Sequence, residues 1–167
     1  MKIWIGIDPG CAGAIAAIAE NADVRIRPLA IRKDADGMNI VDVDIFESDL
    51  RLLACSHEVA VLVEEPLRHA MSSANTIASC WRNFGRIQAI LDFIRFPHSS
   101  VPPRTWQPKM LGKVAKGESK TASIAMAKQL FPDATLRRSI RCRTDDDGFA
   151  DALLLAAYLR AYVDTPK

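Results

Sequence analysis

Apolar and polar positions alternate at the start of the chain. Residues 2–7 (KIWIGI) are rich in Ile and end at a turn sequence, DPG, over residues 8–10, as expected for a strand followed by a turn. Residues 13–19 and 23–31 have the composition of two further strands, and Pro28 places the second of these at a sheet edge. The first part of the chain is therefore expected to form an antiparallel meander.

The rest of the chain changes to helical spacing interrupted by short apolar runs. Residues 57–63 (HEVAVLV) have the pattern of a buried strand that ends at Glu64. The other expected elements are helices over 42–56, 73–96, 106–111, 118–130 and 147–162, a short strand over 99–101, and a basic loop over 112–117. Without the short helix at Trp106 the order is β-β-β-α-β-α-β-α-α, which predicts an α/β fold with a five-stranded mixed sheet flanked by helices.

Size and composition narrow the class of protein. The 167 residues are enough for one core and too few for two ordinary domains, so a single domain over residues 1–167 is expected. Apolar residues make up 49% and charged residues 25%, the balance of a globular protein. No run has the apolar length of a membrane span, and the first ten residues do not resemble a signal peptide, so we expect a cytoplasmic protein with no membrane partner.

Charge is distributed unevenly along the chain. Residues 104–143 hold ten basic residues against two acids, a net +8, which leaves −6 for the remainder of a chain whose total is +2. A basic segment beside an acidic remainder favours a surface that binds a polyanion over the alternative that these are only solvated side chains on exposed helices. The candidate DNA-binding residues are Arg104, Lys109, Lys113, Lys116, Lys120, Arg137, Arg138, Arg141 and Arg143.

Two carboxylates follow strands. Asp8 ends the first strand, where Asp-Pro-Gly is also ordinary turn chemistry. Glu64 ends the buried run, where a charge is costly unless it reaches water or a cation, so a ligand role is favoured. Glu65 is the weaker candidate because side chains alternate along a strand.

Two more carboxylates begin the last helix. The run of three acids at 145–147 complements a helix N-terminus. Asp147 and Asp151, however, form an i, i+4 pair of like charges that destabilises a helix by roughly a few tenths of a kcal/mol, and Asp151 precedes an apolar run. A bound cation would remove both costs.

A carboxylate metal site is the chemistry that these residues favour. The four cysteines and three histidines are dispersed, with no spacing typical of a zinc site. Four carboxylates could hold two Mg²⁺ ions about 4 Å apart for phosphodiester hydrolysis, and Mn²⁺ is expected to substitute.

Six segments in order resemble the motifs of RuvC-type Holliday junction resolvases, especially phage and prophage members. They are IGIDPG, VLVEEP, NFGRIQAIL, TWQPKMLGK, SKTASIAMAKQLFP and DGFADALLLAAY. The resemblance covers nearly the whole chain. It implies a ribonuclease-H-like fold in which the first and fourth strands are neighbours, a homodimer, Mg²⁺ or Mn²⁺ dependence, and paired symmetric nicks at a four-way junction.

The resemblance also implies roles for single residues. Position by position, the metal-binding and catalytic acids are Asp8, Glu64, Asp147 and Asp151, with Asp146 an open alternative to Asp147 because family members differ in this spacing. The basic residue near the scissile phosphate is Lys120, or less securely Lys109 or Lys113. The segment after Glu64 corresponds to the place where the family opens junctions, which makes Leu67, His69 and Met71 candidates for contact with an unstacked base, as well as for simple packing. Trp81 and Phe84 fit core or dimer-interface positions better than DNA contacts.

Three other functions remain open. A RuvC-like nuclease that prefers forks or other branches differs only in substrate. A non-catalytic module that binds branched DNA needs the basic segment but not the acids. An actin-like kinase also begins with a strand ending in an acid, but it needs a second lobe that 167 residues do not supply. The setting expected from the resemblance is a bacterial cell or a phage-infected host cell.

Overall fold

The computed structural model describes residues 1–54, 57–67 and 73–164. Its main sheet has five strands in the order β3-β2-β1-β6-β7. Their bounds are Lys2–Asp8 (β1), Ala14–Ala19 (β2), Val24–Pro28 (β3), Glu58–Glu64 (β6) and His98–Val101 (β7). The first three strands pair antiparallel, whereas β6 is parallel to both β1 and β7. The predicted five-stranded mixed sheet is confirmed, and β3, the strand with Pro28, lies at an edge as expected.

The helices also follow the predicted order, with shifted ends. Their bounds are Val43–Ala54 (α1), Ala74–Phe93 (α2), Pro103–Leu111 (α3), Ser119–Leu130 (α4) and Asp147–Tyr158 (α5), followed by a π-helical turn over Leu159–Val163. The last helix was expected to continue to residue 162, but its final turn changes hydrogen-bonding pattern after Tyr158. No helix in the described ranges is long and apolar enough to cross a membrane.

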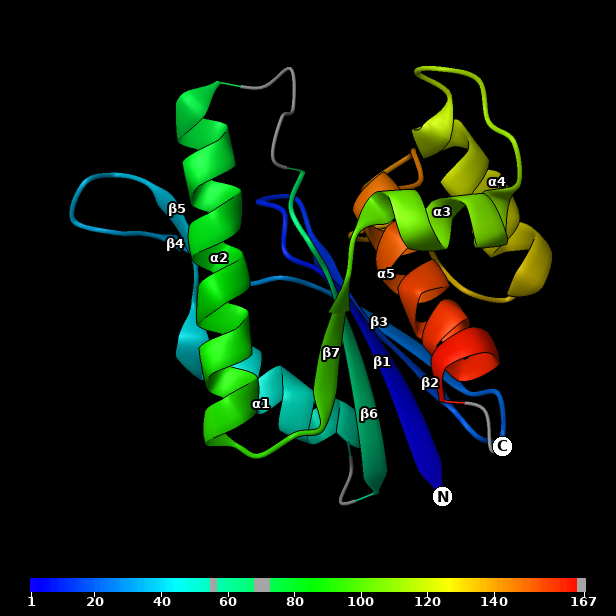
Figure 1. Ribbon diagram of the computed structural model, residues 1–167, viewed down its shortest axis with the longest axis horizontal. Helices are drawn as coiled ribbons and strands as arrows, with labels where there is room; N and C mark the ends of the chain where they lie inside the picture. The colour runs from blue at the N-terminus through cyan, green and yellow to red at the C-terminus, as the bar shows by residue number, and fades with distance from the viewer. Residues whose placement is uncertain (55–56, 68–72, 165–167) are drawn as a thin grey trace.

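Two apolar layers cover the sheet because side chains of β1 alternate between its faces. Ile3, Ile5 and Ile7 pack with α1 and α2 in one cluster. Trp4 on the other face packs with β2 and with α5, a largely buried helix, in a second cluster. Figure 1 shows this arrangement, with α1 and α2 on one side of the sheet and α3, α4 and α5 on the other.

The contact between β1 and α5 depends on a glycine. A Cβ atom placed on Gly6 would lie 2.2 Å from the carbonyl oxygen of Ala152 and 2.4 Å from the backbone nitrogen of Ala156. Only glycine allows α5 to lie this close to the strand. The N-terminus of α5 is thereby held above the edge of the sheet where β1 ends.

A small hairpin, β4 (Ile31–Lys33) and β5 (Asn39–Val41), was not predicted. It docks on α2, where Asn83 Oδ1 accepts the Val41 N–H at 2.9 Å and the Ser79 hydroxyl donates to the Asn39 carbonyl at 2.6 Å. Strands of three residues are too short to show an alternating pattern, so side-chain contacts with α2 define them instead.

Candidate active site

The predicted acids come from β1, β6 and α5, which meet at the end of the sheet where β1 and β6 finish. In the parallel pair β1 and β6, Ile7 lies beside Val63, so Asp8 and Glu64 follow at neighbouring positions. The prediction that these two strands are adjacent is confirmed. A cleft of about 500 Å³ at this end is lined by both acids, by two acids of α5 and by neighbouring basic residues, among them Asp8, Glu64, Asp147, Asp151, Lys120 and Arg104.

Burial raises the pKa values of three of these carboxyl groups, so their ionised forms are disfavoured. It raises the pKa of Asp8 to about 6, against the hydrogen bond from the Gly10 N–H at 2.9 Å, and the nearby charge of Asp147 adds to the rise. It raises the pKa of Asp151 to about 7. Burial, followed by the charges of Asp8 and Asp151, also raises the pKa of Glu64 well above its usual value. Negative charge at this site is therefore stabilised poorly by the protein itself.

The donor set suits a hard divalent cation. Asp151 Oδ1 is buried with no hydrogen-bond partner among the described residues, although the nearby Ser123 hydroxyl lowers the pKa of Asp151 against the larger effect of burial. In their present orientations, no three His, Cys, Asp or Glu side chains of the described ranges form a group that could hold a metal ion. The fit to a metal thus rests on buried carboxylate oxygens lining one cleft, which are the ligands that Mg²⁺ and Mn²⁺ prefer.

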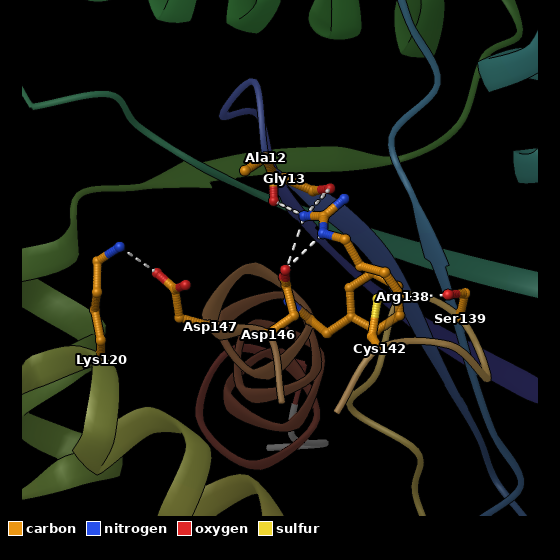
Figure 2. Close-up of polar contacts among 9 residues, drawn as sticks. Ala12, Gly13, Lys120, Arg138, Ser139, Cys142, Asp146 and Asp147 are labelled. Atoms are coloured by element: carbon orange, nitrogen blue, oxygen red, sulfur yellow. Dashed lines mark hydrogen bonds and ion pairs between the residues drawn. The ribbon is translucent and has the colours of Figure 1, made fainter. Parts of the chain in front are cut away.

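Lys120 supplies a positive charge to the cleft. Its ammonium group lies 2.7 Å from Asp147 Oδ2, and Figure 2 shows it reaching from α4 toward the N-terminus of α5. The hydrogen bond with Asp147 raises the pKa of Lys120, which keeps the side chain protonated at neutral pH. The Lys120 ammonium group thus lies beside one of the acids and lines the cleft.

Asp146 and Asp147 have different surroundings. Asp146 caps α5, accepting the Phe149 N–H at 3.1 Å, and it is bound by Arg138, whose Nε lies 2.5 Å from Asp146 Oδ2. Asp147 lines the cleft. Figure 2 shows the Asp146 carboxylate directed to Arg138 and the Asp147 carboxylate directed to Lys120. The geometry therefore favours Asp147 over Asp146 as a site residue.

Arg138 makes internal contacts. Besides Asp146, its guanidinium group donates to the carbonyl oxygens of Ala12 and Gly13 and lies 5.3 Å from the ring centroid of Phe149. These contacts tie the loop before α5 to the turn that follows Asp8. Arg138 was predicted to bind DNA, but the structure places its donors on the protein backbone and on a carboxylate.

One residue of the site was not anticipated from the sequence. Trp106 of α3 is fully buried, and its indole N–H donates to Glu64 Oε1 at 2.9 Å. This contact lowers the pKa of Glu64 against the larger effect of burial. Sequence reasoning placed Trp106 in a short helix only, because nothing in the spacing links it to an acid more than forty residues earlier. Glu65 also lines the cleft, and its carboxylate accepts a hydrogen bond from the Ser100 hydroxyl at 2.9 Å.

The other basic candidates spread outward from the cleft. Arg104 lies at its rim, and Lys116 joins it in an adjoining hollow. Lys109 is directed away, with its ammonium group 5.6 Å from the ring centroid of Tyr158. Arg137 lies 3.8 Å from Asp145. The remaining candidates are exposed: Lys113, Arg141 and Arg143.

The candidates for base contact follow Glu64, and the candidates for core or dimer-interface positions lie on α2. Leu67 is exposed and lines the cleft, whereas His69 and Met71 lie outside the described residues. Phe84 is buried, and the Trp81 ring meets it edge to face at 5.6 Å between centroids. Both aromatics pack against the core under α2, in agreement with the core positions predicted for them.

The sheet order and the helices on both faces are those of the ribonuclease-H-like fold of the RuvC type. The fold is similar to that of Thermus thermophilus RuvC, solved in complex with a Holliday junction substrate (TM-score 0.54, 16% identity, 95% of each chain covered). It is also similar to a second Thermus thermophilus RuvC structure (TM-score 0.53, 17% identity, 95% of each chain). The yeast mitochondrial Holliday junction resolvase Ydc2 matches at a TM-score of 0.49 and 16% identity, over 95% of this chain and 80% of that one.

The sequence itself gives no such match. No protein-family model and no curated protein matches the chain. The resemblance to RuvC inferred from six short motifs is therefore confirmed at the level of the fold.

Proposed function

We propose that this chain is a metal-dependent, structure-selective DNA endonuclease that resolves four-way junctions by paired, symmetric hydrolysis of phosphodiester bonds. The observation that carries the proposal is the cleft that gathers Asp8, Glu64, Asp147, Asp151 and Lys120 at the carboxyl ends of two parallel strands. The fold supports it, because a RuvC of the same architecture was solved in complex with a Holliday junction substrate. The nuclease domain of this proposal spans residues 1–167.

The four carboxylates would hold Mg²⁺, with Mn²⁺ as a substitute, and two ions for each site. When bound, the metal would neutralise the clustered acids, polarise the phosphate and make water a better nucleophile near neutral pH. The acids have the properties this role requires, since burial and mutual repulsion disfavour their anionic forms in the protein alone.

Other residues position these groups. Trp106 fixes one oxygen of Glu64, and the Gly10 N–H fixes one oxygen of Asp8, which leaves the second oxygen of each carboxylate for a ligand. Lys120 would stabilise the negative charge that develops on the phosphate, because its ammonium group already lies beside Asp147. Arg104 at the rim would contact the DNA backbone.

Paired nicks require two active sites. A homodimer with two-fold symmetry would present two such clefts to symmetric strands of a four-way junction. Basic residues outside the cleft would bind phosphates and supply most of the affinity: Lys113, Lys116, Arg137, Arg141 and Arg143.

Cleavage of a labelled immobile four-way junction tests the proposal. Linear duplex and a three-way fork serve as controls, and wild type is compared with Asp8→Asn in Mg²⁺ and in EDTA. Paired symmetric nicks that require both metal and Asp8 are the expected result. Preferential cutting of the fork would assign a branch nuclease of a different specificity, and tight binding without cleavage of any branch would replace the nuclease with a DNA-binding module.

A further inference from the structure

We propose that Ile140 contacts unstacked bases at a DNA branch point and helps the protein to discriminate branched from linear DNA. Ile140 lies in the loop of residues 137–143 (RRSIRCR), called here the arginine loop. The inference rests on the proposed function and assigns a second base-contacting element to it. The arginine loop is separate in sequence from the segment after Glu64.

Ile140 is an exposed apolar side chain that could be buried by a binding partner. Its relative exposure is 101%, the highest among the large apolar residues described. A branched apolar side chain gains free energy when it leaves water, and a single exposed one carries little meaning by itself. At this position, however, it stands at the tip of a highly charged loop.

The arginine loop is held in a defined shape. At its base, the Asp146 N–H donates to the Leu136 carbonyl at 2.8 Å, and Leu136 is buried in the core. At its tip, the Cys142 N–H donates to the Ser139 carbonyl at 3.1 Å, which places Ile140 and the following arginine in the middle of a tight turn. The apolar side chain is therefore presented at a fixed place.

The loop leaves the protein beside the cleft. Arg138 joins its base to Asp146 and to the Ala12 carbonyl. A Cβ atom on Gly148 would meet both this carbonyl, at 2.4 Å, and Asp8 Oδ2, at 3.2 Å, so the anchor lies next to the acids. In Figure 2 the anchor and Lys120 lie on opposite sides of the N-terminus of α5. DNA with a phosphate in the cleft would thus have the arginine loop along its flank.

The positive charge of the arginine loop favours DNA as the partner. Arg137, Arg141 and Arg143 are exposed around Ile140, and such arginines bind phosphates while an apolar tip contacts base faces. Base faces are hidden by stacking in linear duplex and become accessible at a branch point. A second copy of the chain is disfavoured as the partner, because a symmetric contact at this loop would bring like charges together.

The test compares Ile140→Ala with Ile45→Ala, a matched control at an exposed isoleucine of α1. Both are made in the Asp8→Asn background so that the DNA stays intact. Affinities for a four-way junction and for linear duplex of equal length are measured at two salt concentrations. Fluorescence of 2-aminopurine at the branch point reports unstacking at saturating protein.

Ile140→Ala is expected to weaken junction binding about tenfold, a change of about 1.4 kcal/mol, with duplex binding and the salt dependence unchanged. The 2-aminopurine signal should fall as well. Arg141→Ala should instead weaken binding to both DNAs and lower the salt slope by about one. Ile45→Ala should behave as the parent.

Each other outcome overturns the inference. Unchanged junction binding, or equal losses on junction and duplex, would remove Ile140 from base contact. A change in sedimentation instead of DNA affinity would assign the arginine loop to a protein interface. Failure of the proposed function is distinguishable, because it would appear as no cleavage of branched DNA by the wild-type protein in Mg²⁺, whatever the effect of Ile140→Ala on binding.

Discussion

At the residue scale, the buried carboxylate of Asp8 destabilises the folded protein when it is ionised and no metal is bound. Its side chain ends a buried strand and faces other acids, and this environment raises its pKa from 3.8 to about 6. An acid with a raised pKa in the folded state stabilises the fold below its unfolded pKa, and this contribution is lost as the pH rises through the folded value. Without metal, the protein should therefore lose stability between about pH 4 and pH 7.

We predict that Asp8→Asn stabilises the metal-free protein about twice as much at pH 8 as at pH 5. The amide is neutral at both values. An unfolded aspartate is already ionised at pH 5, whereas the folded Asp8 carboxyl still holds its proton, so the cost of folding with this acid is about half developed at pH 5 and fully developed at pH 8. With allowance for partial solvent screening, the gain at pH 8 should be about 1 to 2 kcal/mol, or roughly 2–8 °C in melting temperature.

Thermal unfolding in EDTA at the two pH values measures this gain. Asp133→Asn, at an exposed aspartate away from the cleft, is the matched control and should change the melting temperature little at either pH. An Asp8→Asn gain of equal size at both pH values would contradict the explanation. Adding Mg²⁺ should raise the melting temperature of wild type more than that of Asp8→Asn.

Trp106→Phe tests the hydrogen bond that positions Glu64. The substitution removes the indole N–H bonded to Glu64 Oε1 and keeps an aromatic side chain in the core. Loss of a hydrogen bond to a charged group costs about 1.5–3 kcal/mol, so the cleavage rate at limiting Mg²⁺ should fall roughly 10- to 100-fold. Because the bond lowers the pKa of Glu64, the loss should be greatest at acid pH.

Rates measured against Mg²⁺ concentration and pH identify a positioning role. Partial recovery at high Mg²⁺ and alkaline pH is expected for Trp106→Phe, because both conditions favour the ionised, metal-bound carboxylate. Trp81→Phe is the control, since Trp81 packs against the core on the opposite face of the sheet. A defect independent of both variables would assign Trp106 to packing alone.

The sequence revealed the acids but not their supporting contacts. Asp8 and Glu64 were recognisable because each ends an apolar strand, where a charge is costly. The choice between Asp146 and Asp147 was not, because adjacent acids at a helix start look alike until Arg138 is seen to bind Asp146. Trp106 was missed for a related reason, since a contact between distant segments leaves no periodic signal.

At the scale of elements, α5 carries two of the acids and must be held close to β1. Gly6 permits this contact, as a Cβ atom there would lie 2.2 Å from the Ala152 carbonyl oxygen. The order of the long elements was predictable because each has a clear apolar period. The hairpin of β4 and β5 was missed, because its three-residue strands take their place from hydrogen bonds to α2.

We predict that Gly6→Ala destabilises the protein by about 2 to 4 kcal/mol, because a methyl group at this place overlaps backbone atoms that cannot move independently. Gly85→Ala is the matched control. Gly85 lies within α2, where an added Cβ atom would meet open space, so alanine should stabilise by up to about 1 kcal/mol through helix propensity. Urea unfolding measures both free energies, and equal effects of the two substitutions would contradict the proposed contact between α5 and β1.

At the scale of the whole molecule, acids and basic residues occupy different places. The segment with net charge +8 runs through α3, α4 and the loop before α5, which all belong to the layer on one side of the sheet in Figure 1. The candidate acids line the cleft between this layer and the strand ends. Such a division allows a polyanion to be held by the basic residues although the cleft itself contains negative charge.

This division predicts that catalysis and binding separate on mutation. Asp8→Asn, Glu64→Gln and Asp151→Asn should each reduce junction cleavage at least a thousandfold (about 4 kcal/mol), because each removes a negatively charged metal ligand. The same three variants should bind the junction within about threefold of wild type or more tightly, since the loss of negative charge reduces repulsion of phosphates. Replacing Arg141 and Arg143 together with alanine should weaken binding and lower the salt slope by about two.

Single-turnover cleavage measures catalysis, and binding titrations at two salt concentrations measure affinity and its salt dependence. If all three acid variants failed to bind while remaining folded, the acids would belong to the DNA-binding surface, and the separation of charge along the chain would have no functional meaning.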